Sequence, residues 1–250
     1  EAIMENSGFL LIDKPSGMTS HDVIDAVRRV TGERRVGHAG TLDPFATGLL
    51  IVGVGKSATT RLSEFVGLDK EYEATFVLGS TSTTDDPEGT IITTGAINGL
   101  TPSDLSSAMQ SFVGTIEQIP PQYAAIKIKG KKMYELARQG EVIEAKPRTV
   151  TVHSFELREI ASSAVLPPRK NTLDLPVSLN VHLRVSSGTY IRAIARDLGA
   201  KLDVGGYVSQ LRRTSIGPYR VEDADTIDQL QHSDWTKKLQ NLGVDQRPTS

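Results

Sequence analysis

Residues 37–50 read GHAGTLDPFATGLL, and this stretch decides how the whole chain is interpreted. It holds one acid, Asp43, and one histidine, His38, among glycines and small or apolar residues. Pro44 disfavours helical geometry at Asp43 and pushes it toward an extended or turn conformation. The glycines allow unusual dihedral angles and close approach of a ligand to the backbone. An Asp-Pro pair is most simply a turn, so the stretch alone leaves a structural and a catalytic interpretation open.

The composition of the 250-residue chain is that of an ordinary globular protein, with 38% hydrophobic and 23% charged residues. The length allows one large domain, or a domain with a small appendage. The net charge is −2, so any site for a polyanion must be a local patch. The chain has no cysteine, which excludes disulfides and thiolate chemistry. No apolar run predicts a membrane span, and we expect a cytoplasmic protein without a membrane partner.

Hydrophobic periodicity predicts both strands and helices. The predicted strands cover residues 9–13, 48–55, 70–80, 149–160, 178–188 and 207–219. The predicted helices cover residues 20–30, 57–66, 102–112, 189–202 and 225–231. Residues 37–50 are predicted to be mainly loop, 81–90 a turn, and 161–176 a loop or insertion. Strands do not alternate strictly with helices of crossover length, which favours an α+β fold around a mixed, mainly antiparallel sheet flanked by helices.

A nucleotide site is the first alternative, suggested by the run GVGKSA at residues 53–58. A phosphate loop needs a glycine five residues before its Gly-Lys pair, where this chain has Leu50. A dinucleotide site needs an acid about 20 residues on, at the end of the next strand, whereas Glu73 lies near that strand's start. We interpret the run as a tight strand-to-helix turn.

A catalytic carboxylate must stay ionised in a dry site, so it needs a nearby cation, because burial alone raises its pKa. The stretch SSGTYIRAIARDLG at residues 186–199 offers Arg192 among apolar neighbours, an unusual choice for an exposed position. A buried arginine requires a carboxylate partner, which these residues alone do not identify. The following Arg196-Asp197 pair is most simply a solvated helix surface.

Basic residues gather between residues 121 and 148, with Tyr123 and Tyr134 interleaved. Lysine and arginine neutralise phosphates, and tyrosine rings stack on bases, so the segment suits RNA. A solvated hairpin followed by a helix explains the same residues equally well. The histidines show no paired spacing with acids that indicates a metal site, and we expect no metal.

The stretch GHAGTLDPFATGLL closely resembles the catalytic motif of the TruB-type pseudouridine synthases, which make pseudouridine in the T-loop of tRNA. Further stretches resemble that family in the same order: GFLLIDKPSGMTSHDVI, KEYEATFVLG, PPQYAAIKIKGKKMYELARQG, SSGTYIRAIARDLG and LRRTSIGPY. The resemblance implies a catalytic domain over residues 8–220, with a thumb-like RNA-binding insertion over 121–148. Residues 221–250 are then a short C-terminal segment without the complete PUA-type domain of many members.

The resemblance also implies roles for individual residues in catalysis. Asp43 would be the catalytic aspartate, and Arg192 would pair with it. Tyr72 would stack on the target base and assist its deprotonation. Tyr190 and Leu211 would line the uridine pocket.

Other residues would contact the RNA. His38 would shape the RNA backbone around the flipped nucleotide, and Asp86 matches a polar motif near the RNA. The complete set of implied RNA-binding residues is Asp86, Lys127, Lys129, Lys131, Lys132 and Arg148. The family uses no metal and no cofactor, so none is expected here.

The leading hypothesis is therefore a tRNA pseudouridine(55) synthase that flips its target base and acts as a monomer without guide RNA. Three alternatives stay open at this point: an RNA-binding factor that remodels the T-arm, a nucleotide-cofactor enzyme, and a related synthase that modifies ribosomal RNA within a guide-RNA complex. The route also stays open, because a carboxylate can attack the sugar C1′, remove the C2′ proton or attack the base at C6.

Overall fold

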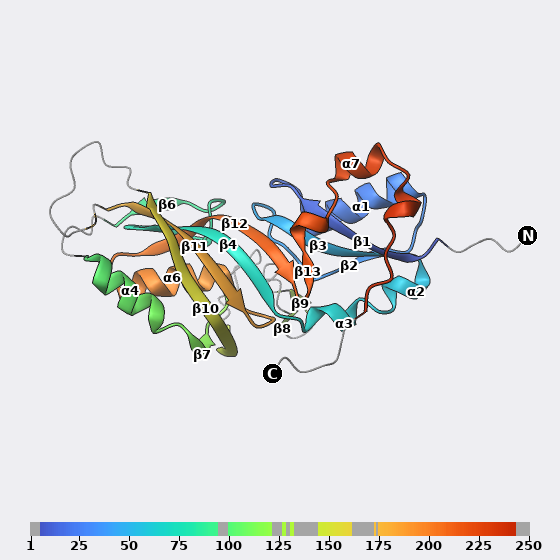
Figure 1. The fold of residues 1–250 in the computed structure, drawn as a ribbon. Helices are drawn as coiled ribbons and strands as arrows, with labels where there is room; N and C mark the ends of the chain where they lie inside the picture. Colours follow the sequence, from blue (N-terminus) through green and yellow to red (C-terminus); the bar gives the residue numbers. More distant parts are fainter. Residues whose placement is uncertain are drawn as a thin grey trace, which may run out of the picture. The chain divides into compact units, whose positions relative to one another are not determined.

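The computed structural model describes residues 6–94, 100–121, 127–128, 131–132, 145–161, 173 and 175–243. The chain forms two compact units, shown in Figure 1. The first unit contains residues 1–72 and 212–250, and the second contains residues 73–211. The chain passes from one unit to the other inside β4 (Lys70–Leu78) and returns inside β12 (Gly206–Ile216).

The first unit is built on a small sheet around β3. Besides the start of β4 and the end of β12, its elements are β1 (Gly8–Lys14), α1 (Ser20–Thr31), β2 (Val36–Ala39), β3 (Thr47–Val54), α2 (Lys56–Thr59), α3 (Ser63–Val66), β13 (Tyr219–Arg220), η1 (Val221–Asp223), α7 (Ile227–Gln231) and η2 (Trp235–Lys238). β1 pairs antiparallel along one edge of β3. β2 and β12 share the other edge, β2 antiparallel and β12 parallel.

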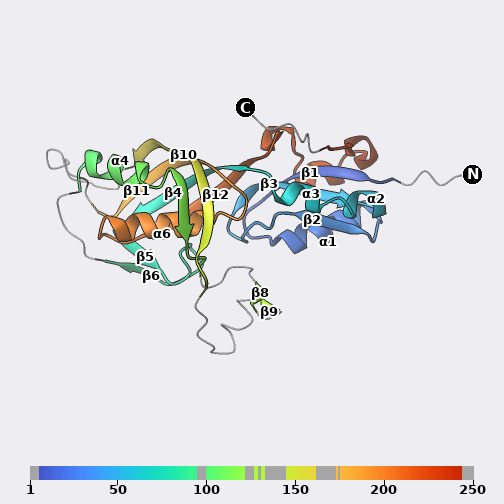
Figure 2. The ribbon, with the colours of Figure 1, turned by 90° about the horizontal axis from the view of Figure 1, so that it is seen from below.

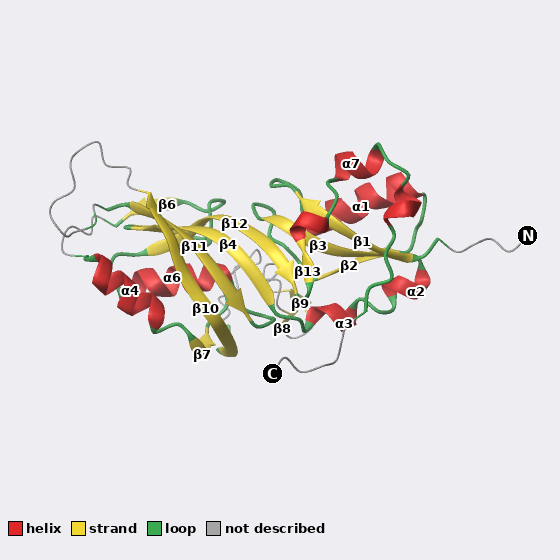
Figure 3. Ribbon diagram, viewed as in Figure 1, coloured by secondary structure: helices red, strands yellow, loops and turns green. Residues whose placement is uncertain are grey.

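Both faces of this sheet are buried. Along β1, Phe9 and Leu11 contribute to one hydrophobic cluster, which also contains Phe65 of α3. The alternate residues Leu10 and Ile12 contribute to a second cluster with apolar residues of α1 and α7. Figure 3 shows α1 and α7 on one face and α2 and α3 on the other. Continuous apolar runs such as residues 48–55 follow from this double burial.

The second unit continues along the chain from β4. Its elements are β5 (Ser80–Ser82), β6 (Ile91–Thr93), α4 (Pro102–Gln110), β7 (Gly114–Gln118), β8 (Lys127–Ile128), β9 (Lys131–Lys132), β10 (Arg148–Ala161), β11 (Val177–Val185), α6 (Ile191–Lys201) and the first part of β12. The sheet runs in the order β12-β4-β11-β10-β7, with β10 antiparallel to both β11 and β7. α4 packs on β10 and on α6. Figure 2 shows the strands and helices of this unit in a second view.

The predicted α+β fold with a mixed, mainly antiparallel sheet is confirmed, since β3 and β12 pair in parallel whereas β1–β3, β2–β3, β7–β10 and β10–β11 are antiparallel. Two of the predicted helices begin with a capping box. Thr19 and Thr101 each form a capping box, with Asp22 and Asp104, at the start of α1 and α4. No helix among the described residues is long and apolar enough to cross a bilayer.

The structure corrects three local predictions. Part of the expected loop at 37–50 is strand β2, because pairing with β3 outweighs its weak local pattern. The predicted helix 57–66 is two short helices, because the amides of Arg61 and Glu64 bond three residues back instead of four. β7 was not predicted, and β8 pairs with β9 in a short antiparallel hairpin.

Gly48 is a position where only glycine fits. Its φ is +108°, and a Cβ built there would lie 2.2 Å from the carbonyl oxygen of Arg213, its partner in the parallel β3–β12 pairing. We predict that Gly48→Ala lowers the free energy of unfolding by at least about 2 kcal/mol, from left-handed strain and displacement of β12. Urea denaturation at pH 7 measures the change.

Gly67 provides the matched control, because its φ is −78° and nothing lies within 4 Å of a Cβ built there. Gly67→Ala should change the free energy of unfolding by less than about 1 kcal/mol. Equal effects of the two substitutions would contradict the packing described for Gly48.

Candidate functional site

Asp43 lies on the loop that joins β2 to β3 in the first unit. Its side chain is half-buried, and its backbone carbonyl accepts a hydrogen bond from the amide of Ala46 at 3.0 Å. This bond closes a turn around Pro44 and Phe45, as the Asp-Pro pair predicts. The carboxylate therefore belongs to a short, turn-closed loop of defined backbone geometry.

A buried lysine holds this loop from one side. Lys14, at the end of β1, is completely buried, and its Nζ donates to the carbonyl oxygens of Pro15 at 2.8 Å, Met18 at 2.7 Å and Pro44 at 3.2 Å. The amide of Gly17 donates to the same Pro44 carbonyl at 2.8 Å. The residue after Asp43 is thus tied to the turn that follows β1.

Two further side chains hold the loop before Asp43. The buried hydroxyl of Ser20 accepts from the amide of Leu42 at 2.9 Å and donates to the Leu42 carbonyl at 3.2 Å. The buried guanidinium of Arg213 donates to the carbonyls of Gly40 at 2.8 Å and Leu49 at 2.9 Å. The backbone is therefore fixed on both sides of Asp43, which is the preorganisation that a catalytic group needs.

His38 lies on β2, directly before the loop. It is half-buried, and its Nδ1 atom is buried without a hydrogen-bond partner among the described residues. Burial lowers the pKa of His38, and the charges of Arg213 and His21 lower it further. A neutral imidazole at pH 7 can both donate and accept a hydrogen bond, which suits contact with a polar ligand.

Tyr72 and Lys70 lie near the start of β4. Tyr72 is 8% exposed, so most of its ring is withdrawn from solvent. Lys70 is also buried, and its Nζ donates to the carbonyl of Val66 at 2.6 Å. Burial lowers the pKa of Lys70 to about 8, with a further contribution from the charge of Arg213, while Asp69 opposes the shift.

Arg192 lies in the first turn of α6, in the second unit, and is 4% exposed. Its Nη1 atom lies 3.3 Å from Oδ2 of Asp86 and donates to the carbonyl of Thr84 at 3.3 Å. The other oxygen of Asp86 accepts from the Thr84 hydroxyl at 2.6 Å and from the amide of Glu88 at 2.9 Å. The burial of Arg192 with a carboxylate agrees with the prediction from its apolar neighbours, whereas Asp86 was not identified as a partner.

Arg196, one turn further along α6, is half-buried, and its interpretation as a solvated surface residue was wrong. Its Nη1 atom lies 3.4 Å from Oδ2 of Asp85, and its Nη2 donates to the carbonyl of Ile119 at 2.7 Å. Its Nε donates to Asp197 at 2.9 Å. Burial raises the pKa of Asp85, and the charge of Arg196 acts in the opposite direction. Two successive acids of the DDPEG turn therefore hold two arginines of one helix.

The remaining predicted residues are in the second unit. Tyr190 is the residue before α6, and Leu211 is a buried residue of β12. Arg148 is exposed at the start of β10, and Lys127, Lys131 and Lys132 belong to the β8–β9 hairpin. Lys129 lies outside the described residues, as do Tyr123, Tyr134 and most of the predicted thumb.

The predicted catalytic residues thus come from two parts of the chain. The first unit supplies Asp43 and Tyr72, and the second supplies Arg192 with Asp86. Within the second unit, the structure brings the last two together. The pairing of Arg192 with Asp43 stays a prediction. The described residues contain no group of three or more His, Asp or Glu side chains that could hold a metal ion.

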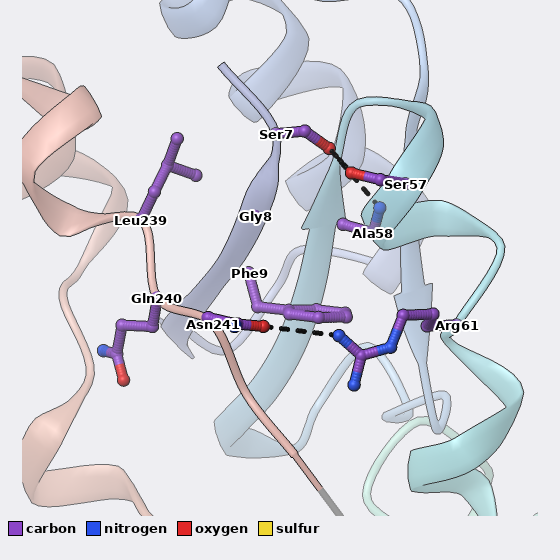
Figure 4. Close-up of a pocket in the computed structure, with 9 residues that line it drawn as sticks. All are labelled: Ser7, Gly8, Phe9, Ser57, Ala58, Arg61, Leu239, Gln240 and Asn241. Carbon is purple, nitrogen blue, oxygen red and sulfur yellow. Dashed lines mark hydrogen bonds between the residues drawn. The ribbon is translucent and has the colours of Figure 1, made fainter. Parts of the chain in front are cut away.

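A hollow of about 400 Å³ in the first unit is separate from these residues and is shown in Figure 4. It lies beside the GVGKSA turn, where the Ser7 hydroxyl donates to the carbonyl of Val54 at 2.9 Å and accepts from the amide of Ala58 at 3.4 Å. Ser7 also contacts Ser57 at 2.5 Å. An amide that a phosphate loop would present to its ligand is already used by Ser7, which favours the interpretation as a structural turn.

Comparison with known proteins gives a consistent assignment along the chain. Residues 28–191 match the family model described as TruB family pseudouridylate synthase, N-terminal domain. Residues 192–243 match the model described as tRNA pseudouridylate synthase B C-terminal domain. The tRNA pseudouridine synthase B of Thermobifida fusca strain YX is 46% identical over 228 residues, which are 89% of this chain and 74% of that protein.

Two further similarities bear on function. The tRNA pseudouridine synthase B of Streptomyces coelicolor is 47% identical over 224 residues, which are 90% of this chain and 72% of that protein. A chain from the crystal structure of the archaeal box H/ACA sRNP Nop10–Cbf5 complex superposes with a TM-score of 0.61 at 25% identity. That similarity covers 90% of this chain and 53% of the archaeal chain, so this chain spans about half of its length.

The buried Asp86–Arg192 pair generates a prediction. Removing one charge of a buried ion pair typically costs about 3–5 kcal/mol, whereas an exposed pair contributes about 0–1 kcal/mol. We predict that Asp86→Asn lowers the free energy of unfolding by about 3 kcal/mol in urea denaturation. Asp25→Asn, which removes partly exposed pairs with Arg28 at 2.9 Å and His21 at 3.7 Å, is the control and should cost less than about 1 kcal/mol. Equal losses would show that burial of the pair has no energetic consequence.

The lowered pKa of Lys70 predicts a pH dependence. Between about pH 8 and the ordinary lysine pKa of 10.5, the unfolded state binds the Lys70 proton more tightly than the folded state does. The free energy of unfolding therefore gains a contribution that rises with pH in this window. The free energy of unfolding of wild type minus that of Lys70→Met should rise from pH 8 to pH 10.5. It should stay constant between pH 6.5 and 7.5. Lys56→Met, at an exposed position, is the control. A difference in unfolding free energy between wild type and Lys70→Met that does not change with pH would contradict the lowered pKa of Lys70.

Proposed function

Because the chain belongs to the TruB family of pseudouridylate synthases, we propose that it isomerises uridine to pseudouridine at position 55 in the T-loop of tRNA. The observation that carries the proposal is the Asp43 loop, whose sequence resembles the family's catalytic motif. Lys14, Ser20 and Arg213 fix that loop on both sides of the carboxylate. The relatives named tRNA pseudouridine synthase B support tRNA as the substrate.

The reaction breaks the N1–C1′ glycosidic bond of uridine, rotates the uracil and forms a C5–C1′ bond. The C5 hydrogen leaves as a proton, and N1 gains one, so the product is an isomer of the substrate. Asp43 would act on the sugar or on the base, by attack at C1′, by removal of the C2′ proton or by attack at C6. All three routes need an ionised carboxylate in a site from which the detached uracil cannot escape.

A uridine inside a folded RNA loop is inaccessible to such a carboxylate, so the nucleotide must flip out of its stack. Flipping costs a few kcal/mol, and stacking on an aromatic ring recovers about 1–3 kcal/mol of it. Tyr72 would provide this ring, while Leu211 and Tyr190 would enclose the uracil. His38 is neutral at neutral pH, and in this proposal it supports the RNA backbone near the flipped nucleotide.

Arg192 would supply the positive charge that keeps Asp43 ionised. This role fits a guanidinium that is 4% exposed and oriented by Asp86 and the Thr84 carbonyl. Asp86 would then act by orienting Arg192, in addition to or instead of the RNA contact that the sequence implied.

The proposal extends to partners and location. The chain would act on the tRNA T-stem-loop as a monomer, in the cytoplasm, without a metal, cofactor or guide RNA. The solved chain from a box H/ACA complex is 25% identical, whereas the relatives named for tRNA are 46% and 47% identical, which favours a tRNA enzyme over a guide-RNA enzyme. The exposed Arg148 and the lysines of the β8–β9 hairpin would neutralise phosphates of the T-stem.

The test is tritium release from a tRNA transcript labelled at C5 of uridine, because formation of the C5–C1′ bond must expel that hydrogen. We predict release by wild type without guide RNA, and a loss of at least about 1000-fold in Asp43→Asn, since an amide can neither attack nor accept a proton effectively. Asp223→Asn, at an exposed position, is the control and should react like wild type.

Three other results would change the interpretation. Release by neither protein, with tRNA binding intact, would contradict the enzymatic proposal and leave an RNA-binding protein that remodels the T-arm. Release by both wild type and Asp43→Asn would retain the enzyme but reject Asp43 as its catalytic residue. Release only when a guide RNA is added would favour the ribosomal RNA alternative.

A further inference from the structure

Gln118, the last residue of β7, uses both ends of its carboxamide on a single residue. Its Oε1 accepts from the backbone amide of Tyr190 at 2.8 Å, and its Nε2 donates to the Tyr190 carbonyl at 3.1 Å. The Gln118 side chain is almost completely buried, with 1% exposed. Such a two-point contact fixes both the position and the rotation of the Tyr190 backbone, which a single hydrogen bond cannot do.

Tyr190 is the point from which α6 starts. Its carbonyl also accepts from the amides of Ala193 at 3.1 Å and Ile194 at 3.2 Å, the first hydrogen bonds of the helix. Its own side chain makes no capping hydrogen bond to α6. The geometry of the helix start therefore depends on how Gln118 holds the Tyr190 backbone from outside the helix.

Arg192 follows two residues later and is held on its other side by Asp86 and the Thr84 carbonyl. The next residue of the β7 segment, Ile119, accepts from Arg196 at 2.7 Å. Two successive residues, Gln118 and Ile119, thus anchor α6 at its start and one turn further along. Ile119 contacts α6 through its backbone carbonyl, whereas Gln118 does so through its side chain. Of the two residues, only at Gln118 would a substitution therefore remove the hydrogen bonds to α6.

We propose that Gln118 is a positioning residue for uridine isomerisation, which orients the Tyr190 phenol and the Arg192 guanidinium through the backbone at the start of α6. The inference rests on the proposed function, because Tyr190 and Arg192 have their roles only in that reaction. Gln118 itself does not touch the reacting atoms. A displacement of about 1 Å in catalytic groups can reduce a rate by about 100-fold, so a positioning residue of this kind affects the chemical step.

Two substitutions of similar size distinguish a positioning role of the Gln118 side chain from simple filling of space. Gln118→Leu fills the volume and removes both hydrogen bonds. Gln118→Glu keeps the acceptor for the Tyr190 amide, but it can donate to the Tyr190 carbonyl only while its carboxyl is protonated. A protonated carboxyl reproduces the hydrogen-bonding pattern of the carboxamide, and the ionised form places two oxygens against each other.

The experiment measures single-turnover tritium release and tRNA binding for wild type and both variants, at a temperature where urea denaturation and circular dichroism show all proteins folded. We expect Gln118→Leu to slow the chemical step by about 10- to 100-fold at every pH, with the tRNA dissociation constant changed less than about threefold. We expect the rate of Gln118→Glu relative to wild type to fall as pH rises through the pKa of the introduced carboxyl.

Gln110→Leu is the matched control, because Gln110 is exposed at the end of α4 and should keep the wild-type rate. A folded Gln118→Leu variant with the wild-type single-turnover rate would overturn the positioning role and leave the proposed function intact. A loss confined to tRNA binding would overturn it as well. Absence of tritium release by wild type would instead overturn the proposed function, and the positioning role with it.

Discussion

The buried guanidinium of Arg213 is the interaction on which the first unit depends. Its backbone pairs with Gly48 in the parallel β3–β12 pairing, and its side chain donates to the carbonyls of Gly40 and Leu49. One residue of β12 thus contacts the start of the loop that carries Asp43 and the strand β3 that follows this loop. A buried guanidinium is costly unless its donors are used, so the loop must present its carbonyls in this arrangement when the unit folds.

The second unit uses a buried and a half-buried cation in a comparable way. Arg192 and Arg196 lie four residues apart on one helix face, and they pair with the successive acids Asp86 and Asp85. Lys14 in the first unit donates to three backbone carbonyls. In each case a cation withdrawn from solvent orders irregular backbone that secondary structure leaves without partners. Backbone polar groups of these loops are therefore paired by side chains where regular structure does not pair them.

Much of this could be predicted from the sequence, and the exceptions have a physical cause. Strong periodic patterns located β1, α1, β3 and β11, and the isolated Arg192 among apolar residues indicated a buried cation. β2 and β7 were missed because strands of four or five residues carry little periodic pattern of their own and form through pairing with another strand. The pairing of Asp86 with Arg192 was also missed. The sequence of a turn rich in threonine and aspartate shows that acids are present, but not which arginine or lysine they will pair with in the fold. Gln118 carried no local signal at all, because a buried glutamine is recognised only by its partner.

The charge distribution connects the fold to its RNA substrate. The net charge of the chain is −2, and the cations that order the loops, such as Lys14 and Arg213, are buried against protein carbonyls and so cannot neutralise phosphates. Affinity for a polyanion must then come from exposed basic residues such as Arg148, and basic residues are densest in the sequence between residues 121 and 148. Exposed cations would thus bind the tRNA phosphates, whereas buried cations such as Lys14 and Arg213 hold the loop that carries Asp43. Salt, which screens exposed charges far more than buried ones, should weaken tRNA binding long before it disturbs the geometry around Asp43 or Arg192.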